Sequence, residues 1–435
     1  MPPIGHAAAM TSEQPTGPTR RFPGWRVVAG CFIVLAVNSG LAFYGLAVYL
    51  NAFSKEQGWT LGSISFATTI FFVVGGLTGL VAGRLIQRFD VRIVITVGAV
   101  IAGASLAVVG QVDQIWQLYV SYVVFAFGYA LAGLVPTTTV VTRWFHVKRS
   151  IALSVASTGL SVGGIVVTPL AKALIDEHGL ATTTPWLGVF FVVGILPATI
   201  FLIRPDPASD GYEPDGAVIS VERPAGPPTG VTASVAFDSR FYKAVTAGYV
   251  LALGSQVGGI QQLVKLVEDR TNASTAQFAI TVLAATSVVA RLVGGRVATS
   301  VPLTRFIVAL SGLQALALAG LALSTNRVPL FIAIVVFGAT IGNILMLQPL
   351  LIAERFGVLD YSRIYARTQA VAIVGVAGGP LLIGWLFDLS GNYRWAYLAA
   401  AGLSMLGALV LSTAGPAEVE QVEHEPVPGR LPSPS

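Results

Sequence analysis

Charged residues are scarce in this sequence. Only 11% of the 435 residues are Asp, Glu, Lys or Arg, whereas 54% are hydrophobic. Soluble domains carry about 25% charged residues, so the composition argues against a chain that folds in water. Apolar runs of about 20 residues recur along the whole length, and each can cross the bilayer as a helix. No segment shows the alternating pattern of a membrane barrel, so we expect an all-α integral membrane protein.

Chemical signatures of enzymes are also missing. Cys31 is the single cysteine, so no disulfide can form within the chain. The sequence has no phosphate-binding Gly-rich loop, no nucleophile-elbow motif and no His/Cys cluster with metal-ligand spacing. We therefore expect no enzyme site, no cofactor, no metal and no drive by ATP. The net charge of +5 comes from loops and does not indicate binding to nucleic acid.

Twelve transmembrane helices account for the apolar runs. They are predicted at 26–50, 61–83, 91–111, 116–142, 150–175, 185–203, 241–266, 274–298, 303–324, 328–353, 363–387 and 393–413. Six fall in an N-terminal bundle, residues 26–204, and six in a C-terminal bundle, residues 241–414. A Pro-rich polar segment over 205–240 is predicted to be a flexible linker between the bundles. The tails cover 1–25 and 415–435, and the second, rich in Pro and Glu, is expected to be disordered.

Positive charge is distributed unevenly between the two ends of the predicted helices. With twelve helices, the two tails and the linker lie on one side of the membrane. Most Lys and Arg residues fall in these segments and in the loops on their side, and few fall in the loops on the opposite side. In membrane proteins the cytoplasmic loops carry the excess of Lys and Arg. We therefore expect a multi-pass protein of the inner or plasma membrane, with both termini and the linker in the cytoplasm.

The two predicted bundles resemble each other in sequence. The tripeptide GRL at 83–85, after the second helix, recurs as GRV at 295–297, after the eighth. Phe-Gly at 127–128 in the fourth helix recurs at 337–338 in the tenth, and each pair leads to a proline later in its helix, Pro136 and Pro349. Parallel repeats of this kind build many secondary transporters, with the site between the halves near the midplane. We therefore predict two pseudo-symmetric six-helix bundles around a central site.

The loop after the second helix carries a family signature. It reads GRLIQRFDVR over residues 83–92 and resembles the helix 2–3 motif of the major facilitator superfamily. Gly83, Arg88 and Arg92 match that motif, whereas Gln87 replaces its Asp. The resemblance implies that this loop latches the inner face through ion pairs and helix-end dipoles. Gln87 weakens that latch unless Asp90 substitutes for the missing acid.

The start of the fifth helix carries a narrower signature. The segment WFHVKRSIALSVASTGLSVG over residues 144–163 resembles helix 5 of monocarboxylate transporters and oxalate/formate antiporters. Lys148 and Arg149 would anchor the helix at the cytoplasmic surface. Gly159 and Gly163 form a small face along which a neighbouring helix can pack closely and slide. These four residues are therefore predicted to take part in the conformational change.

Arg291 lies inside the apolar stretch 278–298. A charge at that depth costs on the order of 3 kcal/mol, and a guanidinium cannot lose its proton to escape the cost. The resemblance implies that an Arg at this place in the eighth helix binds the substrate carboxylate, which its paired N–H donors fit. The alternative is an Arg that extends its side chain toward the cytoplasmic end of the helix, about 10 Å away.

The sequence also departs from these relatives. Ser287 stands four residues before Arg291, where animal monocarboxylate transporters carry Asp. No Asp, Glu or His lies in the middle of a predicted helix, although a proton relay normally needs such a group. Anion exchange or facilitated diffusion is therefore more plausible here than in those relatives, although a proton could still travel on the substrate.

Other polar groups in apolar helices are predicted to line the substrate pathway. Each could instead form a hydrogen bond between helices. Gln262 occupies a place where oxalate/formate-type relatives often carry His. The full predicted set beside Arg291 is Gln262, Asn343, Tyr122, Tyr129, Asn38, Ser161 and Gln369.

The sequence thus predicts a transporter that works by alternating access. It would be a secondary active or facilitative carrier of small organic anions, mono- or dicarboxylates, with Arg291 pairing with the substrate. Its partners would be the lipid bilayer and a co- or counter-transported ion, a proton or a second anion, and the protein would be a monomer. The alternatives are a major facilitator exporter of drugs or secondary metabolites and, third, a membrane sensor that transports nothing.

Overall fold

The computed structural model describes residues 22–219 and 229–417. Most of the predicted N-terminal tail, part of the linker and nearly all of the C-terminal tail lie outside these residues. The described residues form twelve helical spans that are long and apolar enough to cross a membrane, which confirms the all-α fold class. Only helices can span hydrocarbon in this way, because each backbone N–H and C=O must find its partner within the segment.

The first six spans contain several breaks in α-helical geometry. The elements are α1 (Gly24–Asn38), the π-helix η1 (Ser39–Phe43), α2 (Gly45–Glu56), α3 (Leu61–Arg88), α4 (Val91–Val109), α5 (Ile115–Leu131), α6 (Leu134–Trp144), α7 (Arg149–Val162), the π-helix η2 (Gly163–Val167), α8 (Thr168–His178), α9 (Leu180–Pro197) and the π-helix η3 (Ala198–Leu202). Cys31 in α1 is fully buried against this half, with its Sγ atom 3.7 Å from the Thr137 carbonyl oxygen.

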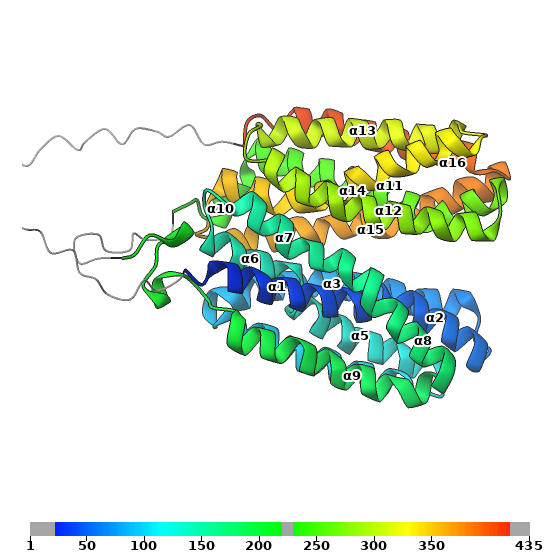
Figure 1. Cartoon of the computed structure of the whole chain (residues 1–435), viewed down its shortest axis with the longest axis horizontal. Coiled ribbons are helices and arrows are strands. Elements are labelled where there is room, and N and C mark those ends of the chain that lie inside the picture. The colour runs from blue at the N-terminus through cyan, green and yellow to red at the C-terminus, as the bar shows by residue number, and fades with distance from the viewer. Residues whose placement is uncertain (1–21, 220–228, 418–435) are drawn as a thin grey trace, which may run out of the picture.

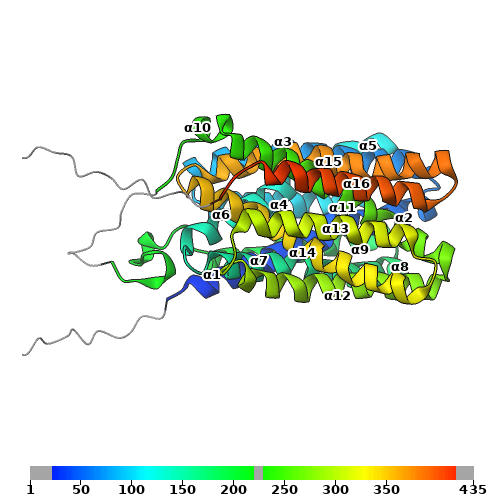
Figure 2. The same ribbon diagram turned by 90° about the horizontal axis from the view of Figure 1, so that it is seen from above.

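The last six spans are continuous helices. They are α11 (Arg240–Arg270), α12 (Ala273–Val297), α13 (Leu303–Leu323), α14 (Arg327–Phe356), α15 (Tyr361–Ser390) and α16 (Tyr393–Ser412). They pack beside the first six, and all run roughly parallel to the long axis of the molecule (Figure 1). The short helix α10 (Ala233–Asp238) and residues 203–219 lie at one end, called the linker end here (Figure 2). The opposite end is called the distal end.

The turn between the fifth and sixth spans is shorter than predicted. The fifth span was expected to end at 175 and the sixth to begin at 185, but Gly179 alone separates α8 from α9. Gly179 has φ 79°, a value that favours glycine. Pro185 lies inside α9 and cannot donate to the Ala181 carbonyl. Gln111 Nε2 donates to that carbonyl instead, at 2.5 Å, and so satisfies the acceptor that the proline leaves without its helical partner.

The described part of the linker is folded, contrary to the prediction of a flexible segment. The Asp215 carboxylate accepts from the backbone N–H groups of His146, Val147 and Lys148 at 2.9, 2.7 and 3.1 Å. It thereby occupies the donors that precede α7, where a negative charge is favourable. In the second described part of the linker, which begins at residue 229, α10 packs against α11 and α15. Proline content alone therefore overstated the freedom of this segment.

Close helix packing in the second half depends on glycine. A methyl group at Gly375 of α15 would overlap the Val250 carbonyl group of α11, whereas one at Gly312 of α13 would meet nothing within 4 Å. We expect Gly375→Ala to destabilise the protein by about 1–3 kcal/mol through overpacking. Gly312→Ala should be neutral, or stabilise by up to about 1 kcal/mol through helix propensity. Thermal unfolding of both variants in one detergent checks this, and equal melting temperatures would contradict it.

Candidate functional site

A cavity of about 600 Å³ lies between the two halves. Helices α3, α5, α6, α7, α8, α11, α12, α14 and α15 contribute to its wall, together with η1 and η2. Most of the lining is apolar. The polar lining from the first half is Ser39, Tyr44, Tyr129 and Ser161. The polar lining from the second half is Gln256, Thr281, Ser287, Arg291 and Gln369.

Two π-helical segments meet at this wall. The Thr168 hydroxyl donates to the Gly40 carbonyl at 2.8 Å, and the Ser39 hydroxyl donates to the Leu160 carbonyl at 2.8 Å. A side chain at Gly40 would collide with the Gly163 carbonyl oxygen, only 2.8 Å from the added Cβ atom. Segments of π-helix often mark functional sites. Ser39 in η1 and Ser161, two residues before η2, both line the cavity.

Arg291 is buried in α12, with 2% of its surface exposed, and its side chain lines the cavity. Its Nε atom donates to the Gly342 carbonyl of α14 at 3.1 Å, and its Nη1 atom donates to the Ser157 carbonyl of α7 in the other half. These two bonds leave three of the five guanidinium N–H groups for further acceptors. The side chain thus lies between the halves and does not extend to the membrane surface, contrary to the alternative weighed from sequence.

The lining residues carry a single fixed charge. Arg291 is the only Lys or Arg among them, and none of the residues that line the cavity is Asp, Glu or His. The oxygens of the two bonded carbonyl groups offset part of the cost of burying the guanidinium. They cannot neutralise it, because they carry no net charge. The cavity therefore has a net positive charge and an apolar wall.

Three of the other predicted site residues share the cavity with Arg291. Tyr129 and Ser161 come from the first half and Gln369 from the second. Ser287 lies one helical turn before Arg291, so the two share a face of α12. The Gln256 Oε1 and Ser287 Oγ atoms are buried without a hydrogen-bond partner, so both can still bond a ligand. The polar lining residues that the sequence analysis left out of the predicted set are Ser39, Tyr44, Gln256, Thr281 and Ser287.

The structure places four predicted residues away from the cavity lining. Asn38 Nδ2 donates to the Tyr129 and Ala132 carbonyls, both at 3.2 Å, and Asn343 Nδ2 donates to the Ala290 and Ala339 carbonyls at 3.0 and 2.9 Å. Both amides thus join helices through backbone carbonyls, the other role expected of such groups.

Gln262 and Tyr122 complete this group of four. The Gln262 Oε1 atom accepts from the Tyr393 hydroxyl at 3.2 Å, within the second half. Tyr122 is fully buried and packs edge-on against Phe71 and Phe125. These four residues therefore lie outside the lining of the central cavity in the described structure.

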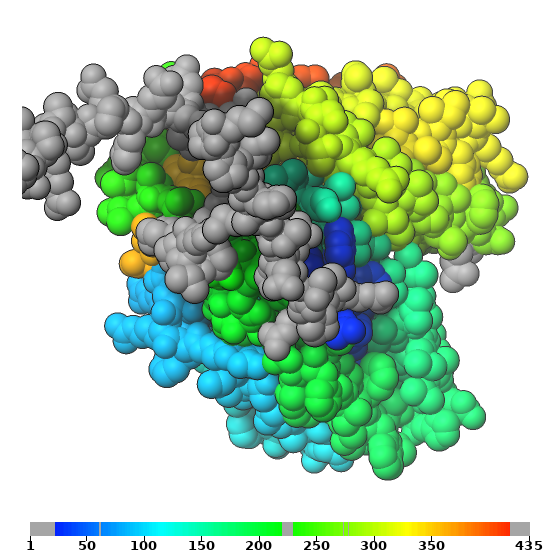
Figure 3. Space-filling model, turned by 60° about the vertical axis from the view of Figure 1, so that its left-hand side comes forward, coloured from blue at the N-terminus to red at the C-terminus, as the bar shows by residue number. Residues whose placement is uncertain are grey.

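The two halves are joined on the linker side of Arg291. The Ser362 hydroxyl donates to the Gly83 carbonyl at 2.9 Å, and Arg149 Nη1 pairs with Glu354 at 3.3 Å. The Ser154 hydroxyl donates to the Arg291 carbonyl at 2.6 Å. Segments of both halves meet at the linker end (Figure 3). On the other side of the cavity, the lining residues Ile165 and Pro169 are exposed.

The acidic residue that contacts the predicted latch loop, residues 83–92, is Asp360 of the second half. Gln87 Nε2 donates to Asp360 Oδ1 at 2.7 Å, and Asp360 Oδ2 accepts from the Ala233 N–H at 2.8 Å. Asp90 does not substitute, because it caps α4 and pairs with Arg92 at 2.7 Å. Burial raises the pKa of Asp90, but hydrogen bonds and charge from Arg92 outweigh it and hold this pKa below its usual value.

The other residues predicted to take part in the latch or in the conformational change have different surroundings. They are Gly83, Arg88, Lys148, Gly159 and Gly163. Gly83 has no room for a side chain, because a Cβ atom would lie 2.6 Å from the Ser362 carbonyl oxygen of the other half. Gly159 and Gly163 instead pack α7 and η2 against α1, within one half. Arg88 and Lys148 are exposed at the linker end, so neither contributes a buried contact.

The chain is similar in sequence and in fold to known membrane transporters. The sequence model of the Major Facilitator Superfamily matches residues 31–254 and 230–431. Rat monocarboxylate transporter 4 is 25% identical over 422 residues, which cover 93% of this chain and 86% of that protein. Rat monocarboxylate transporter 13 is 24% identical over 403 residues, which cover 90% and 88%. The structure of the transporter FucP in its outward conformation has the same fold, with a TM-score of 0.70 and 16% identity over 91% of this chain and 99% of that one.

The bond between Gln87 and Asp360 can be tested by exchanging its two groups. We expect Gln87→Glu to destabilise the linker-end contact by on the order of 1 kcal/mol, because two carboxylates would face each other. Adding Asp360→Asn should restore stability, since the new amide could donate to the new carboxylate and still accept from the Ala233 N–H. Melting temperatures at neutral pH check this. An equal loss in the single and double variants would mean that the pair does not join the halves.

Proposed function

The chain belongs to the Major Facilitator Superfamily and is a multi-pass membrane transporter, and we propose that its substrates are small organic anions. In this proposal the substrate enters the cavity between the halves, and its carboxylate pairs with Arg291. The observation that carries the proposal is the buried guanidinium in a lining without an acidic residue. Arg291 keeps its charge because a guanidinium does not lose its proton, so an anion is the ligand that would neutralise the cavity.

The free guanidinium donors favour a carboxylate in particular. Two N–H groups can meet the two carboxylate oxygens in one plane. At about 4 Å two opposite charges attract by about 4 kcal/mol in a medium of effective dielectric constant near 20. The Gln256 and Ser287 side chains, each with an unbonded oxygen, could hold further polar groups of the substrate. The apolar remainder of the wall suits a hydrocarbon body.

The relatives support the same substrate class. Two mammalian proteins that match nearly the whole chain are named as monocarboxylate transporters. One fixed positive charge would balance one carboxylate, so we favour monocarboxylates over dicarboxylates. Transport would proceed by alternating access: the linker-end contacts open while the distal end closes. The bias of Lys and Arg favours a cytoplasmic linker end, and with that orientation the described state would be open to the outside.

We also propose that the transporter exchanges anions. The cavity lining offers no acid or imidazole that could take up a proton with the substrate. When no substrate is bound, the guanidinium would have to be enclosed without a counter-charge, which is costly. Reorientation should therefore be slow for the empty carrier and fast for the loaded one.

Replacement of Arg291 tests the substrate assignment. We expect Arg291→Ala to reduce carboxylate uptake by about 10- to 100-fold, because a charge-assisted contact is worth about 1.5–3 kcal/mol. Arg291→Lys should restore little, since it lacks the paired donors. Uptake into proteoliposomes of known protein content is the measurement. Arg296→Ala, which removes an exposed Arg from the same helix, is the control. Unchanged uptake by a folded Arg291→Ala variant would refute the assignment and leave drug export as the better candidate.

Counterflow tests the exchange mechanism. We expect labelled monocarboxylate to enter proteoliposomes several-fold faster when unlabelled substrate is inside, because the loaded carrier returns faster than the empty one. An imposed pH gradient alone should drive no accumulation above that of protein-free liposomes. Accumulation driven by the gradient with no internal substrate would instead identify proton symport.

A further inference from the structure

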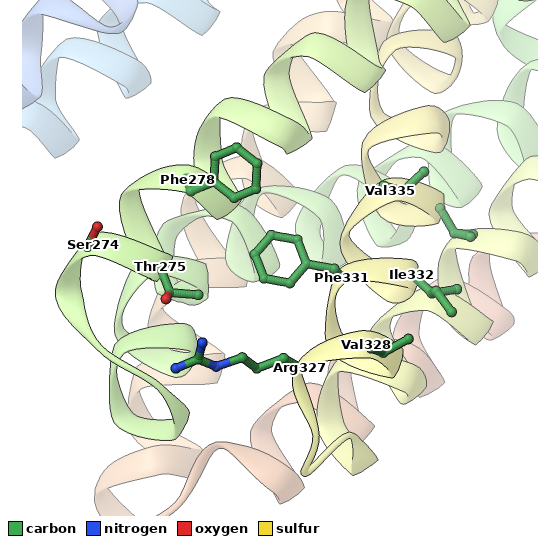
Figure 4. Close-up of a pocket in the computed structure, with 9 residues that line it drawn as sticks. Ser274, Thr275, Phe278, Arg327, Val328, Phe331, Ile332 and Val335 are labelled. Atoms are coloured by element: carbon green, nitrogen blue, oxygen red, sulfur yellow. The ribbon is translucent and has the colours of Figure 1, made fainter.

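A second hollow, of about 770 Å³, lies on the outside of the second half. It is formed by the distal ends of α12 and α14 (Figure 4). Thr275 and Arg327 lie at one end, whereas the Ser274 hydroxyl points away from Arg327 (Figure 4). The rings of Phe278 and Phe331 lie farther along the same two helices. The hollow thus has a polar end and an apolar body.

The shape of the hollow follows from how α12 and α14 pack. Nearer the midplane the two helices are in close contact, because a Cβ atom at Gly338 would lie 2.7 Å from the Leu283 carbonyl oxygen. Toward the distal end, Phe278 and Phe331 fill part of the space between the helices, with ring centroids 5.7 Å apart. The space beyond these rings is the hollow.

The depth of the hollow matches the bilayer boundary. Arg327 is the first residue of α14, and this helix has 30 residues, about 45 Å in length. The hydrocarbon core is about 30 Å thick, so the first turn of α14 can lie among lipid headgroups. Val335, which also lines the hollow, lies about 12 Å farther along the helix, at hydrocarbon depth. Acyl chains, rather than water, fill a surface hollow at that depth.

The polar end is suited to an anion. Among the residues that the structure describes, Arg327 has no ion pair and donates no hydrogen bond. The N-termini of α12 and α14 lie here as well, and their first N–H groups add positive potential. Asn272 caps α12 through the Thr275 N–H at 2.8 Å, which leaves the Thr275 hydroxyl available as a donor.

We propose that this hollow is a binding site for an anionic glycerophospholipid. The lipid phosphate pairs with Arg327 and accepts from the Thr275 hydroxyl. One acyl chain lies along Phe278, Phe331 and Val335. A free phosphate would satisfy the polar end only, so the apolar body of the hollow selects a lipid. This site is separate from the central cavity and does not depend on what that cavity carries.

Lipid titration of the purified protein tests the proposal. The probe is phosphatidylglycerol added to delipidated protein in neutral detergent, with bound lipid counted by native mass spectrometry. We expect the dissociation constant to rise about tenfold in Arg327→Gln. It should not change in Arg394→Gln, which removes an exposed Arg from the start of α16. Phosphatidylcholine should bind more weakly, because its headgroup has no net charge.

The competing occupants give distinct results. Inorganic phosphate and glycerophosphoglycerol, which carry the phosphate but no acyl chain, should not displace the bound lipid. Displacement by either would overturn the proposal in favour of a simple anion site. Equal affinity of the wild-type protein and Arg327→Gln for phosphatidylglycerol would also overturn it, as would equal affinity of the wild-type protein for the two lipids.

Discussion

The buried positive charge of Arg291 is the constraint on which the arrangement of the two halves depends. The guanidinium is held by the Gly342 carbonyl of its own half and by the Ser157 carbonyl of the other. These dipoles make burial tolerable without removing the charge. Because Ser157 lies across the interface, the surroundings of the guanidinium depend on how the halves sit. Under the proposed function, a carboxylate would bind the remaining N–H donors of the same guanidinium, so substrate binding and the contact between the halves would be linked.

The linker-end closure is built from small and uncharged contacts as much as from ion pairs. Gly83 and Ser362 bring the backbones of α3 and α15 together. The Gln87 amide donates a hydrogen bond to the Asp360 carboxylate. An acidic residue at position 87 would instead repel Asp360. Asp360 also binds the start of α10 through the Ala233 N–H. One carboxylate thus connects the first half, the folded end of the linker and the second half.

The sequence allowed the fold to be predicted because bilayer-length apolar runs leave few alternatives to spanning helices. The site was predictable only in part. Arg291 stood out through its charge, but uncharged polar residues on helices that are apolar all round give no sign of which face is inward. Asn343 and Tyr129 are both uncharged polar residues in apolar helices. Asn343 nevertheless donates to backbone carbonyls, whereas Tyr129 lines the cavity. The Gln87–Asp360 bond joins residues 273 positions apart, so no local motif could reveal it.

The burial of Cys31 has a practical consequence for following how the halves move. It is the only cysteine in the chain, and none of its surface is exposed. Polar maleimides and nitroxide reagents should therefore find no native target in the folded protein. A pair of thiols engineered one on each half would be the only labelled positions. The distance between two such spin labels could then report directly on rocking of the bundles.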